Sequence, residues 1–136
     1  MKDELTIEVR VRYSDTDQMG VVYYANYFTW LEVARTEFFR VKGFNYRDIE
    51  KERSLALPVV EASCSYKSPA LYDDLVVIKT RVAKVKNSSL LFEYNLYNKE
   101  TNKLLAHAST AHAFIDIGQR KPVRIPKDIR QALECA

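Results

Sequence analysis

Apolar and polar residues alternate without exception over nine positions at the start of the chain. The apolar positions are Leu5, Ile7, Val9, Val11 and Tyr13, with Thr, Glu and Arg between them. A period of two predicts a strand over residues 5–13 with one buried face. Residues 14–20 interrupt the pattern with two aspartates and a glycine, which predicts a loop.

The spacing changes to that of a helix from about residue 22 to residue 42. Apolar side chains recur at helical spacing, at Tyr24, Tyr27, Phe28, Leu31, Ala34, Phe38 and Val41. Trp30, Val33 and Phe39 widen this stripe beyond one face, and Gly43 is a natural end of the helix. A helix this aromatic must be covered on most sides, and we expect a sheet curled around it.

The rest of the chain predicts four further strands. They are residues 59–66, 75–86, 90–97 and 104–117, with short helical segments expected at 45–53 and 127–133. The polar breaks at 87–88 and 101–102 are compact enough for hairpins, so the last strands should be antiparallel. The predicted class is α+β, with one long helix packed against one antiparallel sheet of five strands.

Composition indicates one globular domain over residues 1–136, because hydrophobic residues make up 47% and charged residues 29%. The net charge of +3 permits an anionic ligand and does not require nucleic acid. Only two cysteines occur, Cys64 and Cys135, so a disulfide framework is not expected. Without an apolar run long enough for a membrane span or a signal peptide, we expect a cytoplasmic protein.

The loop before the predicted helix carries the candidate chemistry. Asp15 and Asp17 can accept hydrogen bonds from free backbone N–H groups, so a capping turn explains them as well as catalysis does. Their spacing to Gly20 also matches part of a calcium-binding EF-hand loop. That loop needs oxygen ligands where this chain has Met19, and a bidentate Glu where it has Asn26, so calcium is not expected.

Here the sequence resembles the hotdog-fold acyl-CoA thioesterases of the YbgC type, which are related to 4-hydroxybenzoyl-CoA thioesterase. The shared motif consists of Tyr13, Asp15, Asp17, Gly20, Val22, Tyr23, Tyr24 and Tyr27, followed by Glu32 and Arg35. The likeness extends to residues 72–74 and 125–127, and so covers nearly the whole chain. It implies the hotdog fold, in which one long central helix is wrapped by a five-stranded antiparallel sheet, and this agrees with the element order above.

The resemblance also implies roles for three residues. Asp17 is the family's catalytic carboxylate, acting as nucleophile or as general base on water. The backbone N–H of Tyr24 would hydrogen-bond the thioester carbonyl, and Gly20 would allow a tight turn. Many relatives have His in place of Tyr24, which leaves the backbone role intact. No metal or redox cofactor is implied, since CoA is part of the substrate; Asp15 is expected to be mainly structural.

A site with one carboxylate and one backbone N–H can be sufficient for hydrolysis of a thioester. The positive end of the helix favours the oxygen as it gains charge, and a thiolate leaves without a general acid. Relatives bind CoA phosphates with basic residues of a hairpin turn, where this chain has Lys84 and Lys86, although solvated lysines explain them equally well. The resemblance further implies a homodimer or homotetramer with sites at the subunit interface.

Other polar residues are expected to be structural. His107 and His112 should face opposite sides of a strand, Cys64 should be an inert core thiol, and Glu32 and Arg35 are spaced as a helix pair. Glu61 lies in a predicted strand from which it could reach the cavity, but a solvent-facing or paired carboxylate is expected.

Two other functions remain open on the same fold. One is a non-catalytic acyl-CoA-binding or assembly module. The other is a dehydratase, which uses a His in a different motif, and no His lies near residue 24. Single-stranded nucleic acid is not expected, because the aromatic residues follow core spacing. The acyl group is not predicted.

Overall fold

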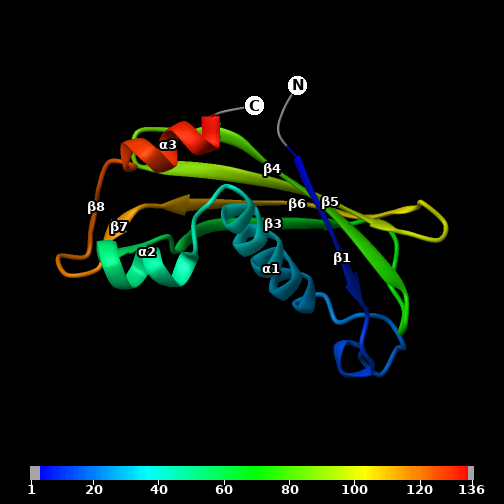
Figure 1. Cartoon of the computed structure of the whole chain (residues 1–136). Coiled ribbons are helices and arrows are strands. Elements are labelled where there is room, and N and C mark those ends of the chain that lie inside the picture. Colours follow the sequence, from blue (N-terminus) through cyan, green and yellow to red (C-terminus); the bar gives the residue numbers. More distant parts are fainter. Residues whose placement is uncertain (1–3, 135–136) are drawn as a thin grey trace.

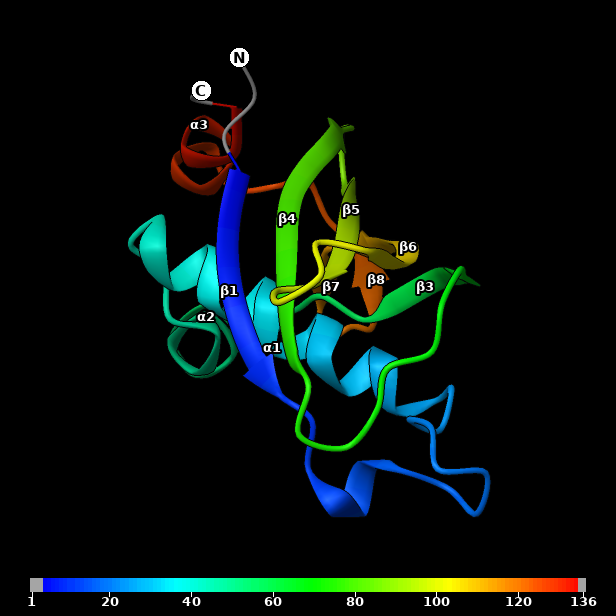
Figure 2. The same cartoon turned by 90° about the vertical axis from the view of Figure 1, so that its right-hand side faces the viewer.

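A computed structural model describes residues 4–134, and Cys135 lies outside this range. Five antiparallel strands form the main sheet, in the order β1-β4-β5-β6-β3, with β1 and β3 at opposite edges (Figure 2). The strands are β1 (Glu4–Arg10), β3 (Val59–Tyr66), β4 (Leu75–Val85), β5 (Ser89–Asn98) and β6 (Leu104–Ala113). The predicted α+β class and antiparallel sheet are confirmed.

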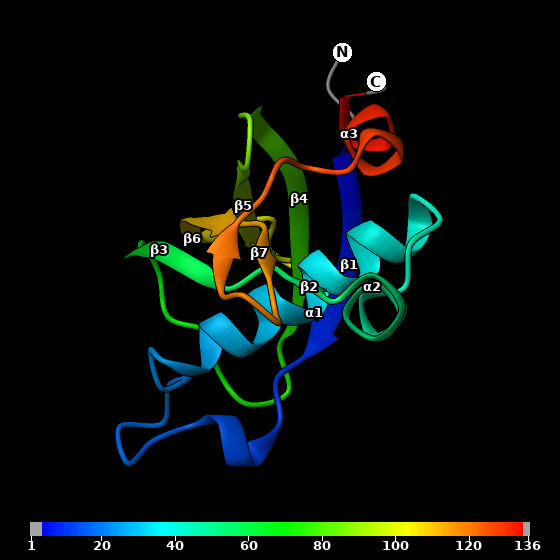
Figure 3. The same cartoon turned by 90° about the vertical axis from the view of Figure 1, so that its left-hand side faces the viewer.

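Helix α1 (Asn26–Val41) lies across the inner face of this sheet (Figure 3). Its aromatic stripe packs on the alternate side chains that the strands turn inward. The rings of Phe38 and Phe39 meet Phe92 edge-on at 5.5 and 6.0 Å, and all three are buried. The curved sheet therefore covers the aromatic helix, as its composition requires.

Helix α1 begins four residues later than the sequence pattern predicts, at Asn26 instead of residue 22. Val22 is held in extended conformation, because it bridges Thr16 and its N–H donates to the carbonyl of Ala70 at 2.9 Å. The far end agrees with the prediction. Gly43 has φ +97°, a left-handed conformation that suits glycine after a helix.

Two predicted strands are shorter in the structure. Strand β1 ends at Arg10, and Tyr13 instead opens a 3-10 turn, η1 (Tyr13–Asp15), with its ring 78% exposed. The strand predicted over 104–117 breaks at Phe114, whose ring is fully buried. The chain then enters a second, three-stranded sheet of β2 (Leu55–Ala56), β7 (Ile115–Asp116) and β8 (Lys121–Pro122).

Two short helices, α2 (Tyr46–Arg53) and α3 (Lys127–Glu134), lie near the end of the molecule where the small sheet is found (Figure 1). The Arg53 guanidinium joins them by donating to both carboxylate oxygens of Asp128 at 2.9 and 2.6 Å. Within residues 4–134, no helix combines the length and the apolar composition that crossing a bilayer requires.

Candidate active site

The loop before α1 is a tight hairpin. Thr16 bridges Val22, the N–H of Asp17 donates to the carbonyl of Val21 at 2.9 Å, and the N–H of Gly20 donates to the carbonyl of Asp17 at 3.0 Å. Gly20 has φ +83°, so the turn requires a left-handed residue at this position. The backbone thus holds Asp17 at the base of a three-residue loop, in the segment that leads into α1.

Within residues 4–134, only one of the two carboxylate oxygens of Asp17 accepts a hydrogen bond. Its Oδ1 accepts the N–H of Met19 at 2.8 Å, whereas Oδ2 has no hydrogen-bond partner within residues 4–134. The hydroxyl of Tyr23 has a raised pKa, mainly through its neighbour Tyr24, and the charge of Asp17 contributes to this increase. Asp17 therefore lies within electrostatic reach of Tyr23, and one of its oxygens is not bonded to the described part of the protein.

Asp15 is bonded quite differently. It is 4% exposed, and its carboxylate accepts the backbone N–H of Arg12 at 2.8 Å and the Arg12 guanidinium at 3.3 Å. Its carbonyl accepts the N–H of Tyr23 at 2.9 Å and the side-chain amide of Asn26 at 2.8 Å. Asp15 anchors the loop to the helix, and no oxygen of its carboxylate is left without a partner.

The start of α1 offers unpaired donors. The N–H groups of Tyr24 and Ala25 make no hydrogen bond within the part of the chain that the structure describes, and no side chain caps this helix end. Free N–H groups and the helix dipole together make this end electropositive. A carbonyl oxygen that gains negative charge is therefore favoured there.

An apolar hollow of about 320 Å³ opens beside the helix start. It is lined by Val21, Val22, Tyr24, Tyr27, Tyr66, Lys67, Ser68 and Pro69. The Tyr66 ring meets Tyr24 at 6.3 Å and Tyr27 at 5.0 Å, both edge-on, and its hydroxyl donates to the carbonyl of Tyr24 at 2.8 Å. The sequence pattern does not indicate Tyr66 as a site residue, because it ends an edge strand and nothing in the local pattern links it to the helix.

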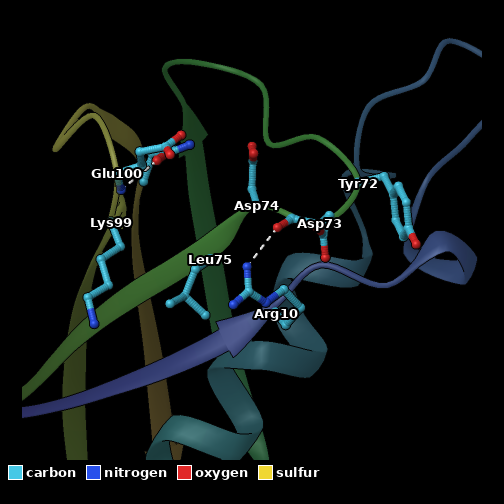
Figure 4. A pocket seen from close by; sticks show the side chains of 8 residues that line it. Arg10, Tyr72, Asp73, Asp74, Leu75, Lys99 and Glu100 are labelled. Atoms are coloured by element: carbon cyan, nitrogen blue, oxygen red, sulfur yellow. Dashed lines mark hydrogen bonds between the residues drawn. The ribbon is translucent and has the colours of Figure 1, made fainter.

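A larger hollow of about 660 Å³ lies elsewhere, at the ends of β1 and β4 (Figure 4). It is lined by Arg10, Tyr72, Asp73, Asp74, Leu75, Asn98, Lys99 and Glu100. Arg10 spans it with a 2.9 Å hydrogen bond to the carbonyl of Asp73. Neither Asp17 nor Tyr24 borders this hollow, and charges of both signs line it, so its size alone does not make it the site.

Lys84 and Lys86 border a third hollow of about 150 Å³, together with Glu61. Glu61 lies near the start of β3, whereas Tyr66 ends the same strand beside the candidate site. Within one chain, the two lysines are therefore not brought to Asp17. Glu61 is exposed, as expected.

The helix pair expected between Glu32 and Arg35 is absent as an ion pair within 4 Å among residues 4–134. Arg35 instead reaches the Tyr94 hydroxyl at 3.5 Å, which bonds the hydroxyl of Thr110 at 2.6 Å. These contacts continue to His112, whose Nε2 lies 2.9 Å from the Thr110 hydroxyl. The buried Tyr94, which packs beneath α1, is thus the partner of Arg35 in place of Glu32.

The two histidines face opposite sides of β6, as predicted. His107 is exposed and contacts the amide oxygen of Asn95 at 2.7 Å, while His112 is 1% exposed and lies 3.1 Å from the carbonyl of Leu57. Burial lowers the pKa of His112 from 6.5 to about 4. Cys64 is a free thiol, and burial raises its pKa, which makes it less reactive.

Comparisons with known proteins agree with this geometry. A family model described as the thioesterase-like superfamily matches residues 11–133. The chain is 39% identical over 124 residues to the acyl-CoA thioesterase YbgC of Haemophilus influenzae, which covers 91% of this chain and 90% of that protein. It is 38% identical over 121 residues to the acyl-CoA thioester hydrolase YbgC of Escherichia coli, with 89% of each covered.

A solved structure shares the whole architecture. The DHNA-CoA thioesterase of Staphylococcus aureus superposes with a TM-score of 0.90 at 34% identity, over 95% of this chain and 87% of that one. The match spans both the main sheet and the helix that it covers.

Proposed function

Because the chain belongs to the thioesterase-like superfamily and has the hotdog fold of its relatives, we propose that it hydrolyses acyl-CoA thioesters to a free acid and CoA. Asp17 supplies the reacting carboxylate, and the backbone N–H of Tyr24 binds the thioester oxygen. One observation carries this assignment: a carboxylate with a free oxygen is held by a tight hairpin directly before a helix start with unpaired donors.

Two routes are open to the Asp17 carboxylate. As a nucleophile, its oxygen bonds to the acyl carbon, the carbon–sulfur bond breaks, and the thiolate leaves with the electron pair; water then hydrolyses the resulting anhydride. As a general base, it takes a proton from water as the water oxygen attacks the same carbon. In both routes the thiolate of CoA is a good leaving group, since a thiol has a pKa of roughly 8.5.

The helix start supports either route. The thioester oxygen gains negative charge in the transition state, and the N–H of Tyr24, two residues before α1, makes no hydrogen bond to residues 4–134. One donor placed in this way typically contributes about 3 kcal/mol. The protein therefore needs no second acid to stabilise this charge.

A second subunit would complete the site. Strand β3 is a sheet edge, and Val59, Val60 and Tyr66 on it are 46%, 62% and 42% exposed, which invites pairing with another edge. When two copies pair antiparallel through β3, the start of one strand lies beside the end of the other. Lys84 and Lys86 of the partner subunit would then approach Asp17, where they can bind CoA phosphates.

The test measures chemistry and binding separately. Purified protein is given a panel of acyl-CoAs of graded length and shape, release of the free CoA thiol is followed by a colorimetric thiol reagent, and binding is followed by calorimetry. We expect thiol release on at least part of the panel. Binding of acyl-CoA without thiol release would instead identify a non-catalytic acyl-CoA-binding module.

A further inference from the structure

We propose that Tyr66 is a positioning residue for thioester hydrolysis, and that its hydroxyl holds the N–H of Ala25 in place as a second donor to the thioester oxygen. This hydroxyl donates to the carbonyl of Tyr24 at 2.8 Å, and that carbonyl belongs to the same peptide group as the N–H of Ala25. The inference rests on the proposed thioesterase function, and it adds a donor and the support of that donor to the same site.

The N–H groups of Tyr24 and Ala25 point out of the helix start in the same direction. The carbonyl of Tyr23 accepts the N–H of Asn26. The carbonyl of Tyr24 accepts the N–H of Tyr27 in the same way, so both carbonyls point along the helix. In a trans peptide the N–H points opposite to the carbonyl, so both N–H groups point away from the helix. The thioester oxygen has two lone pairs and can accept both.

The helix itself holds these two peptide groups unequally. The peptide group before Tyr24 accepts the N–H of Asn26 at 2.9 Å. The next peptide group, before Ala25, accepts the N–H of Tyr27 at 3.4 Å, which is longer than the usual range of about 2.7–3.2 Å. At 2.8 Å, the Tyr66 hydroxyl is the closer partner of that second carbonyl. The orientation of the Ala25 N–H therefore depends mainly on Tyr66.

Tyr66 is itself fixed at the helix start. Its ring meets Tyr24 at 6.3 Å and Tyr27 at 5.0 Å, both edge-on, and Tyr27 is buried. The hydroxyl has a single proton, which it donates to the Tyr24 carbonyl, so Tyr66 acts through the peptide group and not on the substrate. A hydrogen bond to the carbonyl of a peptide group also strengthens its N–H as a donor.

The Tyr66 hydroxyl keeps its proton at neutral pH. Burial is the main reason that its pKa is raised, and the nearby Cys64 thiol raises this pKa further. The bond to the Tyr24 carbonyl lies within one chain and uses no atom of a second subunit. Each subunit therefore supports the donors of its own helix start.

This support matters mainly in the transition state. The thioester oxygen gains its negative charge only when the carbonyl carbon is attacked, so a well-placed donor lowers the barrier more than it strengthens binding of the ester. Loss of a whole donor of this kind typically costs about 10²–10³-fold in kcat. Without the Tyr66 hydroxyl the Ala25 donor remains but is held less firmly, so we expect a smaller loss, about 10-fold.

The first measurement uses Tyr66→Phe, which removes the hydroxyl and keeps the ring. Tyr97→Phe is the matched control, because it is the same exchange on another strand, β5, where the ring contacts the Lys79 ammonium at 5.3 Å. Thiol release gives kcat and KM on an acyl-CoA that the wild type hydrolyses. We expect Tyr66→Phe to lose about 10-fold in kcat with little change in KM or melting temperature, and Tyr97→Phe to match the wild type.

The second measurement follows the carbonyl of the bound ester. In the Asp17→Asn protein the ester is not turned over, so infrared difference spectroscopy with an isotope-labelled acyl-CoA can record its carbonyl stretching frequency. Donors that polarise the carbonyl lower this frequency. Adding Tyr66→Phe should move the frequency back toward that of the free ester, while the affinity measured by calorimetry stays the same.

Two results would overturn the positioning role. One is an unchanged kcat in Tyr66→Phe, and the other is a loss of kcat with a lower melting temperature and an unmoved carbonyl frequency, which would make Tyr66 merely structural. Both results leave the thioesterase function in place, because the wild type still releases thiol. Failure of the wild type to hydrolyse any acyl-CoA would overturn the proposed function itself.

Discussion

The hydroxyl of Tyr66 donates a 2.8 Å hydrogen bond to the carbonyl of Tyr24, across 42 residues of sequence. This bond ties the last residue of the edge strand β3 to the residue whose N–H we assign to the substrate oxygen. The edge strand through which a second copy can pair is thus joined directly to the helix start. Subunit pairing and the geometry of the site are therefore expected to depend on each other.

Replacing Asp17 by Asn should abolish most activity without unfolding the protein. The amide is neither a nucleophile nor a base, and within residues 4–134 the Asp17 carboxylate is hydrogen-bonded through Oδ1 alone. We expect kcat to fall by about 10²–10⁴-fold, with a melting temperature close to that of the wild type. Thiol-release kinetics and thermal unfolding measure the two effects.

Asp15→Asn is the matched comparison. In the wild type the buried carboxylate of Asp15 accepts two hydrogen bonds from Arg12, so replacing it should clearly lower the melting temperature. Full turnover by Asp17→Asn would rule Asp17 out as the reacting group.

A site shared between subunits can be recognised by complementation. Lys84→Ala combined with Lys86→Ala should raise KM for acyl-CoA, because CoA phosphates lose their cations. When this double variant is refolded in a 1:1 mixture with Asp17→Asn, half the dimers are mixed, and each mixed dimer has one intact site. We expect about a quarter of the wild-type sites, with normal KM, to reappear.

The same mixture tests the alternative arrangement. If Asp17 and the lysines of one subunit served the same site, every site in a mixed dimer would carry a defect, and no activity with normal KM would return. Size-exclusion chromatography confirms that the mixed species has formed.

Gly20→Ala should disturb the site more than the fold. An added Cβ meets no atom within 4 Å, so the penalty comes only from the left-handed backbone, about 1–2 kcal/mol. The hairpin can escape this strain by opening, which moves Asp17. We expect kcat/KM to fall by about 10-fold, with a loss of only a few degrees in melting temperature.

Gly118→Ala provides the control. Gly118 lies outside the left-handed region, and the nearest atom to an added Cβ is 3.7 Å away. Kinetic constants of this variant should match the wild type, and an equal loss in both variants would show that the φ of Gly20 is not the cause.

Stability should fall as the pH drops from about 6.5 toward 4. In the unfolded chain His112 takes up a proton near its ordinary pKa of 6.5, whereas in the folded protein burial lowers that pKa to about 4. The unfolded state therefore binds more protons in this window, and the free energy of unfolding decreases by up to about 3 kcal/mol. Urea unfolding at several pH values measures the slope.

His112→Gln should flatten this slope, and His107→Gln, the same exchange at an exposed position of β6, is the matched control. Asp128 adds little to this slope above about pH 4, because in the unfolded chain it takes up a proton only near its ordinary pKa of 3.8, and in the folded protein its bonds to Arg53 lower that pKa to about 2. A slope that survives in His112→Gln would assign the pH dependence to other groups.

Much of the fold follows from patterns within a few residues. The strand predicted over residues 59–66 has the bounds of β3, and the helical spacing predicted the long central helix and its end at Gly43. The helix start was predicted four residues early, because a hydrogen bond from Val22 to Ala70, distant in sequence, holds that segment extended. Periodicity describes the local backbone and contains no information about such a partner.

Some residues of the candidate site could be recognised in the sequence, and others only in the structure. The motif around Asp17 and Gly20 was recognisable in the sequence, since one short hairpin contains it. The position of Tyr66 was not, and neither was the separation of Lys84 and Lys86 from Asp17 within one chain.

The sequence by itself determined the elements, their order and the residues with candidate chemistry, because strand and helix periods are properties of neighbouring residues. Only the tertiary structure decided which of those residues meet. The packing of the end of β3 against the start of α1 placed Tyr66 beside Tyr24, and the packing beneath α1 placed Arg35 against Tyr94 instead of Glu32. Contacts of this kind depend on how distant segments pack together, and no local pattern specifies them.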